Sequence, residues 1–308
     1  MVNDVLVLIS KNELIGKYYS KHGLAVEDVW RNNHFSRRKY SILKLFGKVD
    51  LLYGFNKDII KKYNKIIIAQ TNGISDIVMD IKKWNPKAII KYWLWDPVKS
   101  YPYGKIEELS KLSVMGIDCY SFDKDDCIKY KLKYNNNLYP YDIEVSMDEQ
   151  IDVKKSKVLF FGSNKGRLNK VVKVRDALLH NNIEYDFTVL SKNITYIKKY
   201  PDIRFLDKPV KYENIIRKIN ESGCILDIVQ EGQSGLTWRP FEALFYNKKL
   251  ITTNKCIKEF DFYNKNNILV LENNYDEIKD FLALPYIIID EKIKNNYMLE
   301  QWVNNFFK

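Results

Sequence analysis

The chain has 308 residues and a mass of 36.6 kDa, which gives room for two domains. Hydrophobic residues make up 46% and charged residues 29%, which excludes a disordered chain, and 12 glycines with 8 prolines are too few for a collagen-like or low-complexity protein. The formal net charge is +11, and residues 11–62 hold much of the excess, with 12 Lys or Arg against 5 Asp or Glu.

In the first half, apolar runs of strand length alternate with segments of helical period. The predicted strands span 4–9, 49–53, 65–69, 88–94 and 117–121, and the predicted helices span 56–63, 74–84, 102–114 and 123–131. This alternation is typical of a parallel sheet with helices on both faces.

A polar, acid-rich stretch at about 142–157 interrupts the pattern and predicts an interdomain linker. The pattern then restarts, with strands at 157–161, 185–190, 203–206, 224–229, 249–252 and 268–271, and helices at 168–180, 212–221 and 238–246. A final amphipathic helix at 297–307 is suited to pack against the first half. We therefore expect an α/β fold of two doubly wound, Rossmann-like domains, residues 1–150 and 151–290, with residues 291–308 returning to the first domain.

The basic segment 11–62 also carries aromatic residues, among them Trp30, Phe35 and Phe46. This combination suits an anionic surface such as a membrane leaflet or a phosphorylated lipid, and it also suits nucleic acid. A solvated helix face is the third interpretation, because lysine is abundant throughout the chain. The apolar stretch after Met1 is too short for a secretory signal, and no apolar run reaches the length of a membrane span. We expect a cytoplasmic protein, peripheral at the inner membrane face if the basic segment binds lipid.

In an open parallel sheet, ligands bind beyond the carboxyl ends of the strands, so the loops that follow the apolar runs are the first candidates for a site. The strand at 157–161 passes into Gly162-Ser163-Asn164-Lys165-Gly166-Arg167, and a helix begins directly after it. The two glycines let backbone N–H groups approach an anion, and the helix start and two cations add positive charge. The loop outlines a phosphate site. An ordinary strand-to-helix turn is the alternative, because the loop matches neither GxGxxG nor a P-loop.

A second loop of the same character follows the strand at 224–229. It runs from Gln230 to Thr237, contains two glycines and two hydroxyls, and ends where the helix at 238–246 begins. Such a loop at a helix N-terminus suits phosphate oxygens. Glu242, in the first turns of that helix, is placed to reach a sugar hydroxyl, or it is an exposed carboxylate paired with Arg239 three residues before it.

At these residues the sequence resembles the GT-B glycosyltransferases, in particular bacterial enzymes that build capsule, lipopolysaccharide and other surface glycans. The resemblance covers residues 157–271 and rests on Phe-Gly-Ser-Asn-Lys-Gly-Arg at 161–167, on 210–215, and on Gly-Leu-Thr-Trp-Arg-Pro-Phe-Glu-Ala-Leu at 235–244 leading to 250–254. It implies a hexosyltransferase-type enzyme whose second domain binds a nucleotide-diphosphate sugar of UDP or GDP type, facing an acceptor held by the first domain.

The donor contacts that the resemblance implies all lie in loops or first helical turns of the second half. They are Gly162 and Lys165 at the glycine-rich turn and diphosphate, Arg167 as a second cation, Pro209 and Val210 beside the base, Ser234, Gly235 and Thr237 around the phosphates, and Glu242 at the ribose hydroxyls. By its charge, Arg239 also suits contact with the diphosphate. Many retaining members carry another glutamate eight positions before that carboxylate, where this chain has Ser234. The stereochemistry of transfer therefore does not follow from this motif.

The sequence gives no sign of a metal site. The run from Asp123 to Asp126 predicts capping of a helix rather than an Asp-x-Asp metal motif, and the four cysteines lack metal-ligand spacing. We expect no cofactor and no essential divalent ion.

The first half supplies the candidates for acceptor binding and for the catalytic base. The strand at 88–94 delivers Trp93 and Trp95, which suit stacking against sugar rings, and then Asp96 as the base. An Asp-Pro turn is the alternative role for Asp96. The stretch Gln70-Thr71-Asn72-Gly73 ends the preceding strand and suits acceptor hydroxyls, with Asn72 as the expected contact.

We therefore expect a glycosyltransferase that moves a sugar from a nucleotide-diphosphate sugar to a lipid-linked glycan acceptor in cell-surface polysaccharide synthesis. Its expected partners are the nucleotide sugar, the acceptor and an anionic membrane surface, and not nucleic acid. Two alternatives remain open. A nucleotide-sugar epimerase of GT-B shape would need several acid and base groups around the sugar, and a basic nucleic-acid-binding α/β protein would need a signature that the sequence lacks.

Overall fold

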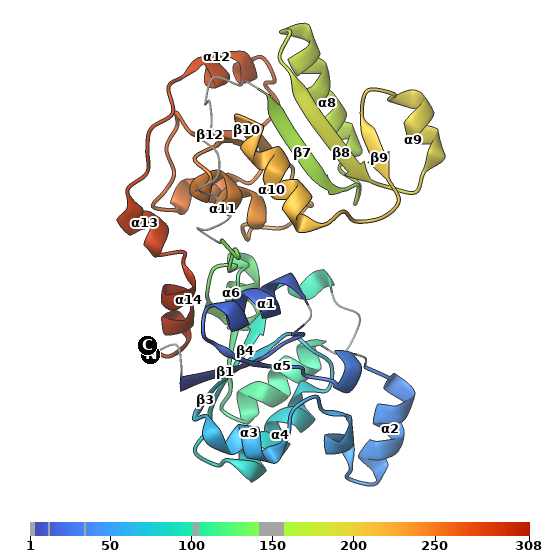
Figure 1. The fold of residues 1–308 in the computed structure, drawn as a ribbon, viewed down its shortest axis with the longest axis vertical. Coiled ribbons are helices and arrows are strands. Elements are labelled where there is room, and N and C mark those ends of the chain that lie inside the picture. Colours follow the sequence, from blue (N-terminus) through green and yellow to red (C-terminus); the bar gives the residue numbers. More distant parts are fainter. Residues whose placement is uncertain (1–3, 12, 34, 101–104, 142–156) are drawn as a thin grey trace. The chain divides into compact units, whose positions relative to one another are not determined.

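The computed structural model describes residues 4–11, 13–33, 35–100, 105–141 and 157–308, and it divides into two compact units (Figure 1). Unit 1 comprises Met1–Pro140 together with Leu299–Lys308, and unit 2 comprises Tyr141–Met298. The predicted linker at 142–157 lies, except for its last residue, outside the described residues.

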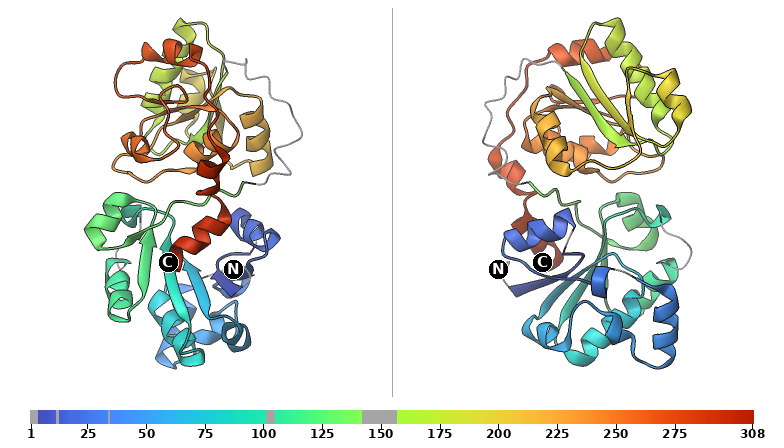
Figure 2. Two further views of the ribbon diagram at one scale, coloured as in Figure 1. Left: turned by 90° about the vertical axis from the view of Figure 1, so that its left-hand side faces the viewer. Right: turned by 45° about the vertical axis from the view of Figure 1, so that its right-hand side comes forward.

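Unit 1 is built on a six-stranded parallel sheet of order β2-β1-β3-β4-β5-β6. Its strands are β1 (Val5–Leu8), β2 (Ala25–Glu27), β3 (Lys65–Ala69), β4 (Ile89–Leu94), β5 (Asp118–Ser121) and β6 (Lys133–Tyr134). Its α-helices are α1 (Leu14–Lys21), α2 (Arg37–Leu45), α3 (Lys57–Lys62), α4 (Ile74–Trp84), α5 (Lys105–Val114), α6 (Lys124–Tyr130) and α14 (Leu299–Phe306). Short 3₁₀ helices are η2 (Arg31–Asn33), η3 (Val49–Leu52) and η4 (Val98–Ser100). Figure 2 shows helices on both faces of this sheet.

The core of unit 1 follows from this double cover. When helices cover both faces of a parallel sheet, neither face contacts solvent. Its central strands are then apolar at every position and do not alternate between apolar and polar residues. Ile66, Ile67 and Ile68 of β3 are all fully buried. Helix α4 buries residues at helical spacing, from Ile74 to Ile81, against the same sheet.

The C-terminal helix α14 packs within unit 1, which confirms the prediction that the chain returns to its first half. Trp302 is fully buried and stacks on Tyr19 with ring centroids 5.6 Å apart. Its indole Nε1 donates to the carbonyl of Asn136 at 2.9 Å, and Asn135 Nδ2 donates to the Trp302 carbonyl at 3.0 Å. One tryptophan thus joins the end of the chain to α1 and to the segment after β6.

Unit 2 is built on a second six-stranded parallel sheet, of order β12-β11-β10-β7-β8-β9. Its strands are β7 (Val158–Ser163), β8 (Tyr185–Leu190), β9 (Arg204–Leu206), β10 (Cys224–Asp227), β11 (Lys249–Thr252) and β12 (Ile268–Val270). Its helices are α8 (Leu168–His180), α9 (Ile194–Lys199), α10 (Tyr212–Asn220), α11 (Trp238–Phe245), α12 (Glu277–Ala283), α13 (Glu291–Asn295) and the 3₁₀ helix η5 (Lys255–Glu259). The expected α/β fold of two doubly wound sheets is confirmed.

One predicted element is wrong. The apolar run at 49–53 was predicted as a strand, but it contains the 3₁₀ helix η3, and β2 takes the edge position beside β1. Val49 and Tyr53 are buried while Leu51 is exposed, so the run meets its apolar contacts without joining the sheet. Short apolar runs do not distinguish a strand from a helical turn by periodicity.

None of the helices in the described ranges is at once long enough and apolar enough to cross a membrane.

Candidate active site

The candidate donor site lies where the strand order of unit 2 reverses, between β7 and β10. From β7, the chain adds β8 and β9 on one side and then β10 to β12 on the other. In such sheets a crevice opens beyond the carboxyl ends of the strands at the reversal, because the two connections leave on opposite faces. The two strands pair with each other in parallel. The predicted phosphate loop at 162–167 begins within the last two residues of β7, and the one at 230–237 follows β10. The two loops therefore lie at neighbouring strand ends of one sheet.

The first loop turns sharply before α8. Lys165 and Gly166 have positive φ angles of 40° and 79°, so the backbone doubles back there. The side chain of Lys165 is exposed, and Asn164 Oδ1 accepts a hydrogen bond from the backbone N of Leu168 at 3.2 Å. A Cβ at Gly162 would lie 3.1 Å from a guanidinium nitrogen of Arg167. The glycine therefore leaves room for that arginine to lie across the loop.

Arg167 joins the two strand ends. Its Nη2 donates to the carbonyl of Ser163, the last residue of β7, at 2.7 Å, and its Nη1 donates to the carbonyl of Ile228, which follows β10, at 2.6 Å. Burial lowers the pKa of the guanidinium. The nearby carboxylate of Asp227 opposes this shift without cancelling it. Arg167 thus holds a half-buried positive charge at the strand-order reversal.

Arg239 reaches the same place from α11. Its Nη2 donates to the carbonyl of Phe161 at 2.9 Å, and its Nη1 forms an ion pair with Glu242. Glu242 is 0% exposed, and its other carboxylate oxygen accepts a hydrogen bond from the Tyr212 hydroxyl at 2.7 Å. Burial opposes the charge on Arg239, but Glu242, Tyr212 and Asp227 together outweigh it and raise the pKa of the guanidinium.

The structure shows the pairing of Arg239 with Glu242 that one of the two sequence interpretations predicts, but not the exposed carboxylate that it also predicts. The pair forms at i, i+3 on the helix, with the carboxylate buried instead of exposed. Because Glu242 is fully buried, a ribose hydroxyl can reach its carboxylate only if a side chain that covers it moves.

Asp227, the last residue of β10, is a site residue that was not predicted from the sequence. It is 2% exposed, and its carboxylate accepts hydrogen bonds from the Thr252 hydroxyl at 2.9 Å and the Thr237 hydroxyl at 3.2 Å. Burial raises the pKa of this carboxyl, against the hydroxyls and the two nearby arginines. Thr237 also caps α11 by accepting from the backbone N of Arg239. A carboxylate closing an otherwise apolar strand was the signal available in the sequence.

The loop before α11 is held in shape by a buried asparagine. Asn254 Nδ2 donates to the carbonyl of Ser234 at 3.0 Å and to that of Gly235 at 3.3 Å. Asn254 is buried, and its Oδ1 accepts from the backbone N of Cys256 to cap η5. The loop after β11 therefore fixes the conformation of the predicted phosphate loop, a role that sequence inspection did not assign.

Pro209 and Val210 lie further from the reversal. They follow β9, the edge strand, which is separated from β7 by β8. Pro209 is exposed and Val210 is half-buried.

In unit 1 the strand order reverses between β1 and β3, and a cavity of about 140 Å³ lies there. Its walls include residues that follow three strands, namely Ser10 after β1, Gln70 and Thr71 after β3, and Trp95 after β4, together with Trp30 and Glu13. Helix α1 is pressed against this edge, because a Cβ at Gly16 would lie 2.1 Å from the Ser10 carbonyl oxygen.

Gln70 organises the polar side of the cavity. Its Oε1 accepts hydrogen bonds from the backbone N of Trp95 at 3.1 Å and of Asp96 at 3.2 Å. Its Nε2 is buried and has no partner among the described residues. The Thr71 hydroxyl accepts from Trp30 Nε1 at 2.7 Å. The cavity therefore presents neutral polar groups and one carboxylate, that of Glu13, beside aromatic walls.

The predicted acceptor and base residues fall in different surroundings. Trp95 lines the cavity, Asn72 is exposed in the loop after β3, and Asp96 is exposed in the bend that precedes Pro97. Trp93 corrects the prediction. It is fully buried and packs on Trp302 with ring centroids 4.8 Å apart, so it cannot stack on a sugar. Helix α14 covers the sheet at Trp93, whereas Trp95 lies beyond the end of β4.

Across the described residues, no three His, Cys, Asp or Glu side chains are grouped so that they could hold a metal ion. Asp123 caps α6, as predicted, by accepting from the backbone N of Asp125 at 3.1 Å and of Asp126 at 3.2 Å.

No protein-family model matches the chain, and no curated protein matches it in sequence. Among solved structures, the chain is similar to a glycosyltransferase from Rickettsia africae ESF-5, with 13% identity and a TM-score of 0.53 over 98% of this chain and 88% of that one. It is also similar to a putative UDP-N-acetylglucosamine 2-epimerase from Listeria monocytogenes, with 8% identity and a TM-score of 0.47 over 99% of this chain and 88% of that one. The glycosyltransferase VinC in complex with DTDP shares 11% identity and a TM-score of 0.43 over 98% of each chain.

The likeness to the Rickettsia protein is one of fold. Two parallel sheets of six strands with alternating helices match the α/β architecture of GT-B glycosyltransferases. At 13% identity the likeness shows a shared fold, and a shared fold does not by itself imply a shared function.

Proposed function

We propose that the protein is a glycosyltransferase that moves a sugar from a nucleotide-diphosphate sugar to a hydroxyl of a glycan acceptor. The observation that carries the proposal is the convergence of Arg167, Arg239 and two predicted phosphate loops at the carboxyl ends of β7 and β10. The resemblance of residues 157–271 to GT-B enzymes, and a fold shared with a Rickettsia africae protein that is a glycosyltransferase, support it.

The donor diphosphate would bind at this reversal point. Lys165 is exposed on the first loop, and the N-termini of α8 and α11 direct their positive ends to the same edge of the sheet. Arg167 adds a fixed positive charge. These groups would stabilise the leaving diphosphate as the bond to the sugar breaks, so in this proposal the nucleotide sugar is the co-substrate and no further cofactor takes part.

For the nucleoside, we retain Glu242 as the ribose ligand. Because the carboxylate is fully buried, the contact requires a local movement, and in this proposal Tyr212 moves away from Glu242 and a ribose hydroxyl takes its place. The stretch at Pro209 and Val210 would lie beside the base.

The acceptor would bind at the cavity of unit 1. Trp95 and Trp30 would cover a sugar face, Gln70, Thr71 and Asn72 would contact hydroxyls, and Asp96 would take the proton of the attacking hydroxyl. We propose that this acceptor is lipid-linked and belongs to the synthesis of a cell-surface polysaccharide such as capsule or lipopolysaccharide, at the cytoplasmic face of the membrane.

Thermal unfolding with a panel of nucleotides and nucleotide sugars tests the proposal, because a ligand that binds only the folded chain raises the Tm. UDP, GDP or dTDP, or one of their sugars, should raise the Tm of the wild type. In Lys165→Ala the affinity for that ligand should fall about tenfold, since one charge-assisted contact is lost.

Lys198→Ala is the matched control, because it removes an equally exposed lysine of unit 2 from α9. It should bind like the wild type. A Tm that no nucleoside diphosphate raises, or equal weakening in both variants, would contradict the donor site.

A further inference from the structure

We propose that α2 and the residues up to η3 form a docking surface for an anionic lipid bilayer, beside the acceptor cavity of unit 1. This α2 surface consists of Arg38, Lys39, Ile42, Leu45, Phe46, Lys48 and Leu51.

Helical spacing gives α2 two different sides. Arg38, Ile42 and Leu45 are spaced i, i+4, i+7 and share one face, whereas Tyr40 and Lys44 lie on the opposite one. The second face is the one that contacts unit 1, and no residue of the helix is fully buried. The face of Arg38, Ile42 and Leu45 therefore points away from the domain.

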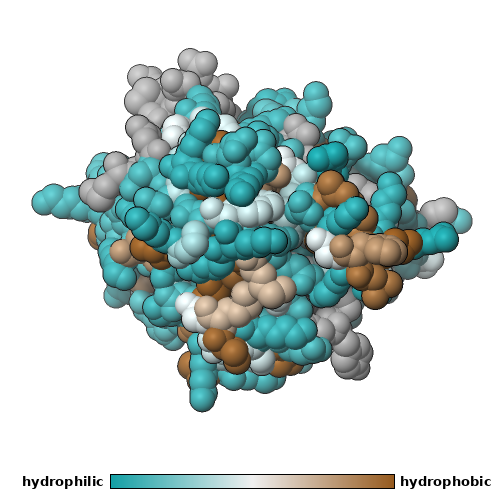
Figure 3. All heavy atoms as spheres, turned by 90° about the horizontal axis from the view of Figure 1, so that it is seen from below, coloured by the Kyte–Doolittle hydropathy of each residue, from teal (hydrophilic) through white to brown (hydrophobic). Residues whose placement is uncertain are grey.

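Large apolar side chains are exposed on this surface. Leu45 is 85% exposed and Phe46 71%, with Ile42 and Leu51 about half exposed. Figure 3 shows hydrophobic side chains gathered on the side of unit 1 where α2 lies in Figure 1, with hydrophilic ones beside them. The interior of a lipid bilayer can bury exposed apolar side chains without a binding pocket of complementary shape. Apolar residues at the end of a helix are therefore well placed to insert into it.

The charge around these side chains is mainly positive. Residues 37–51 contain five Lys or Arg and one carboxylate, the exposed Asp50, and one of the five cations, Lys44, is paired with Asp76. A positive belt around an apolar tip is complementary to a leaflet that has anionic headgroups over an acyl interior.

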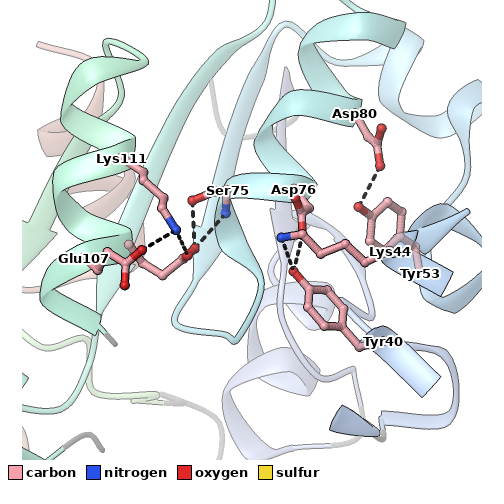
Figure 4. A network of polar contacts seen from close by, with 9 residues as sticks. Tyr40, Lys44, Tyr53, Ser75, Asp76, Asp80, Glu107 and Lys111 are labelled. Atoms are coloured by element: carbon pink, nitrogen blue, oxygen red, sulfur yellow. Dashed lines mark hydrogen bonds and ion pairs between the residues drawn. The ribbon is translucent and has the colours of Figure 1, made fainter. Parts of the chain in front are cut away.

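The helix is firmly attached to the domain, as a docking element must be. The Tyr40 hydroxyl hydrogen-bonds Asp76 on α4, and Lys44 Nζ pairs with the same carboxylate at 2.8 Å (Figure 4). Gly73 precedes α4 with φ of 65°, and a Cβ there would lie 2.8 Å from the Tyr40 ring. The loop after β3 and the inner face of α2 are thus built against each other.

The same contacts place the α2 surface next to the acceptor cavity. The ring of Tyr40 lies 6.1 Å from that of Trp30, and Trp30 lines the cavity and hydrogen-bonds Thr71. A membrane bound by α2 would hold a lipid-linked sugar close to the cavity mouth. On this point alone the inference rests on the proposed function; binding of lipid by α2 does not depend on it.

Two other occupants fit less well. Nucleic acid would use the basic residues, but it leaves four exposed apolar side chains unexplained. A stable protein partner would need roughly 20–30 residues on this side, well beyond this small apolar group.

Flotation of the full chain with lipid vesicles tests the proposal. The wild type should bind vesicles of phosphatidylglycerol mixed with phosphatidylcholine, bind pure phosphatidylcholine vesicles far less, and be released by salt. The double variant Leu45→Ser/Phe46→Ser should bind about tenfold or more weakly. The double variant Arg38→Gln/Lys39→Gln should lose about fivefold per charge.

Val114→Ser is the matched control for the apolar change, since Val114 is 90% exposed at the end of α5. It should bind vesicles like the wild type, and all variants should keep the wild-type circular dichroism spectrum and nucleotide-induced Tm rise. If the α2 variants keep the circular dichroism spectrum and the nucleotide-induced Tm rise but lose vesicle binding, the α2 surface acts independently of the donor site.

Three outcomes would overturn the proposal. They are absence of vesicle binding by the wild type, equal binding to neutral vesicles, and loss of oligonucleotide binding in Arg38→Gln/Lys39→Gln but not in Leu45→Ser/Phe46→Ser. A wild-type dimer that the apolar variant converts to monomer, without vesicle binding, would assign the surface to self-association instead.

Discussion

The two strand-order reversals of the molecule occupy equivalent places in similar sheets and carry opposite chemistry. In unit 2, the guanidinium groups of Arg167 and Arg239 lie at the reversal and donate hydrogen bonds to backbone carbonyls at or near the strand ends. In unit 1, the reversal holds a cavity of about 140 Å³ with Gln70, Thr71 and two tryptophans in its walls. The sheet supplies the position, and the residues at the strand ends decide whether it suits an anion or a hydroxylated, ring-shaped ligand.

The largest expected effect on activity comes from removing the carboxylate charge of Asp96 in unit 1, a change that leaves unit 2 unaltered. Asp96→Asn should lower kcat by about 10²–10⁴-fold, because the acceptor hydroxyl loses its proton acceptor, and should leave nucleotide-sugar affinity unchanged. Steady-state transfer assays and donor titration measure the two effects. Full turnover in this variant would show that the base lies elsewhere.

Substitutions of two neighbouring tryptophans of unit 1 should distinguish a residue that packs in the core from one that binds the acceptor. Trp93→Ala should cost about 3–5 kcal/mol in the free energy of unfolding, because it opens a cavity against Trp302. Trp95→Ala should cost less stability and should raise the KM for the acceptor. Urea unfolding and acceptor kinetics distinguish them, and equal stability losses without any change in KM would remove Trp95 from the acceptor site.

Unit 2 also contains a buried lysine outside the candidate donor site, and its positive charge should destabilise the fold instead of binding a ligand. Lys248 is buried at the amino end of β11, where burial lowers its pKa from 10.5 to about 8. Between these values the unfolded chain binds more protons than the folded one, so the lysine contributes a free energy of unfolding that rises with pH across that window. In Lys248→Met the unfolding free energy at pH 7 should rise by up to about 3 kcal/mol, less the lost bond to the Asn220 carbonyl.

Urea unfolding of the wild type and of Lys248→Met at pH 7 and about pH 9.5 measures this effect. The difference between the two proteins should shrink at the higher pH. A constant difference would show that the lysine has an ordinary pKa.

The smallest expected effect tests the ribose assignment. Tyr212→Phe removes the hydrogen bond to Glu242 and should cost about 1 kcal/mol of stability. Because the carboxylate is then available, donor affinity should rise a few-fold while stability falls. Unchanged or weaker donor binding in calorimetric titration would mean that Glu242 only positions Arg239.

The structural features predicted correctly from the sequence are those that depend on residues close together along the chain. Helix 168–180 and strand 185–190 agree with the structure to the residue, because capping, period and apolar runs are local signals. The loops at 162–167 and 230–237 were found for the same reason. Strands β2 and β6, of three and two residues, are too short to leave a pattern.

Contacts between distant residues could not be predicted in this way. Asp227 acquires its role from Thr237 and Thr252, and Trp93 is buried because α14 returns to cover it. A tryptophan at a strand end has the same local pattern whether it lines a cavity or packs in the core.

Hydrogen–deuterium exchange with and without a saturating nucleoside diphosphate tests the central claim most directly, since it reports where the ligand protects backbone amides. We predict slower exchange in residues 162–168 and 234–239 of unit 2, with no comparable change at residues 70–73 and 95–98 of unit 1. Protection confined to unit 1, or none at either loop of unit 2 under conditions where binding is complete, would contradict the assignment of the donor site.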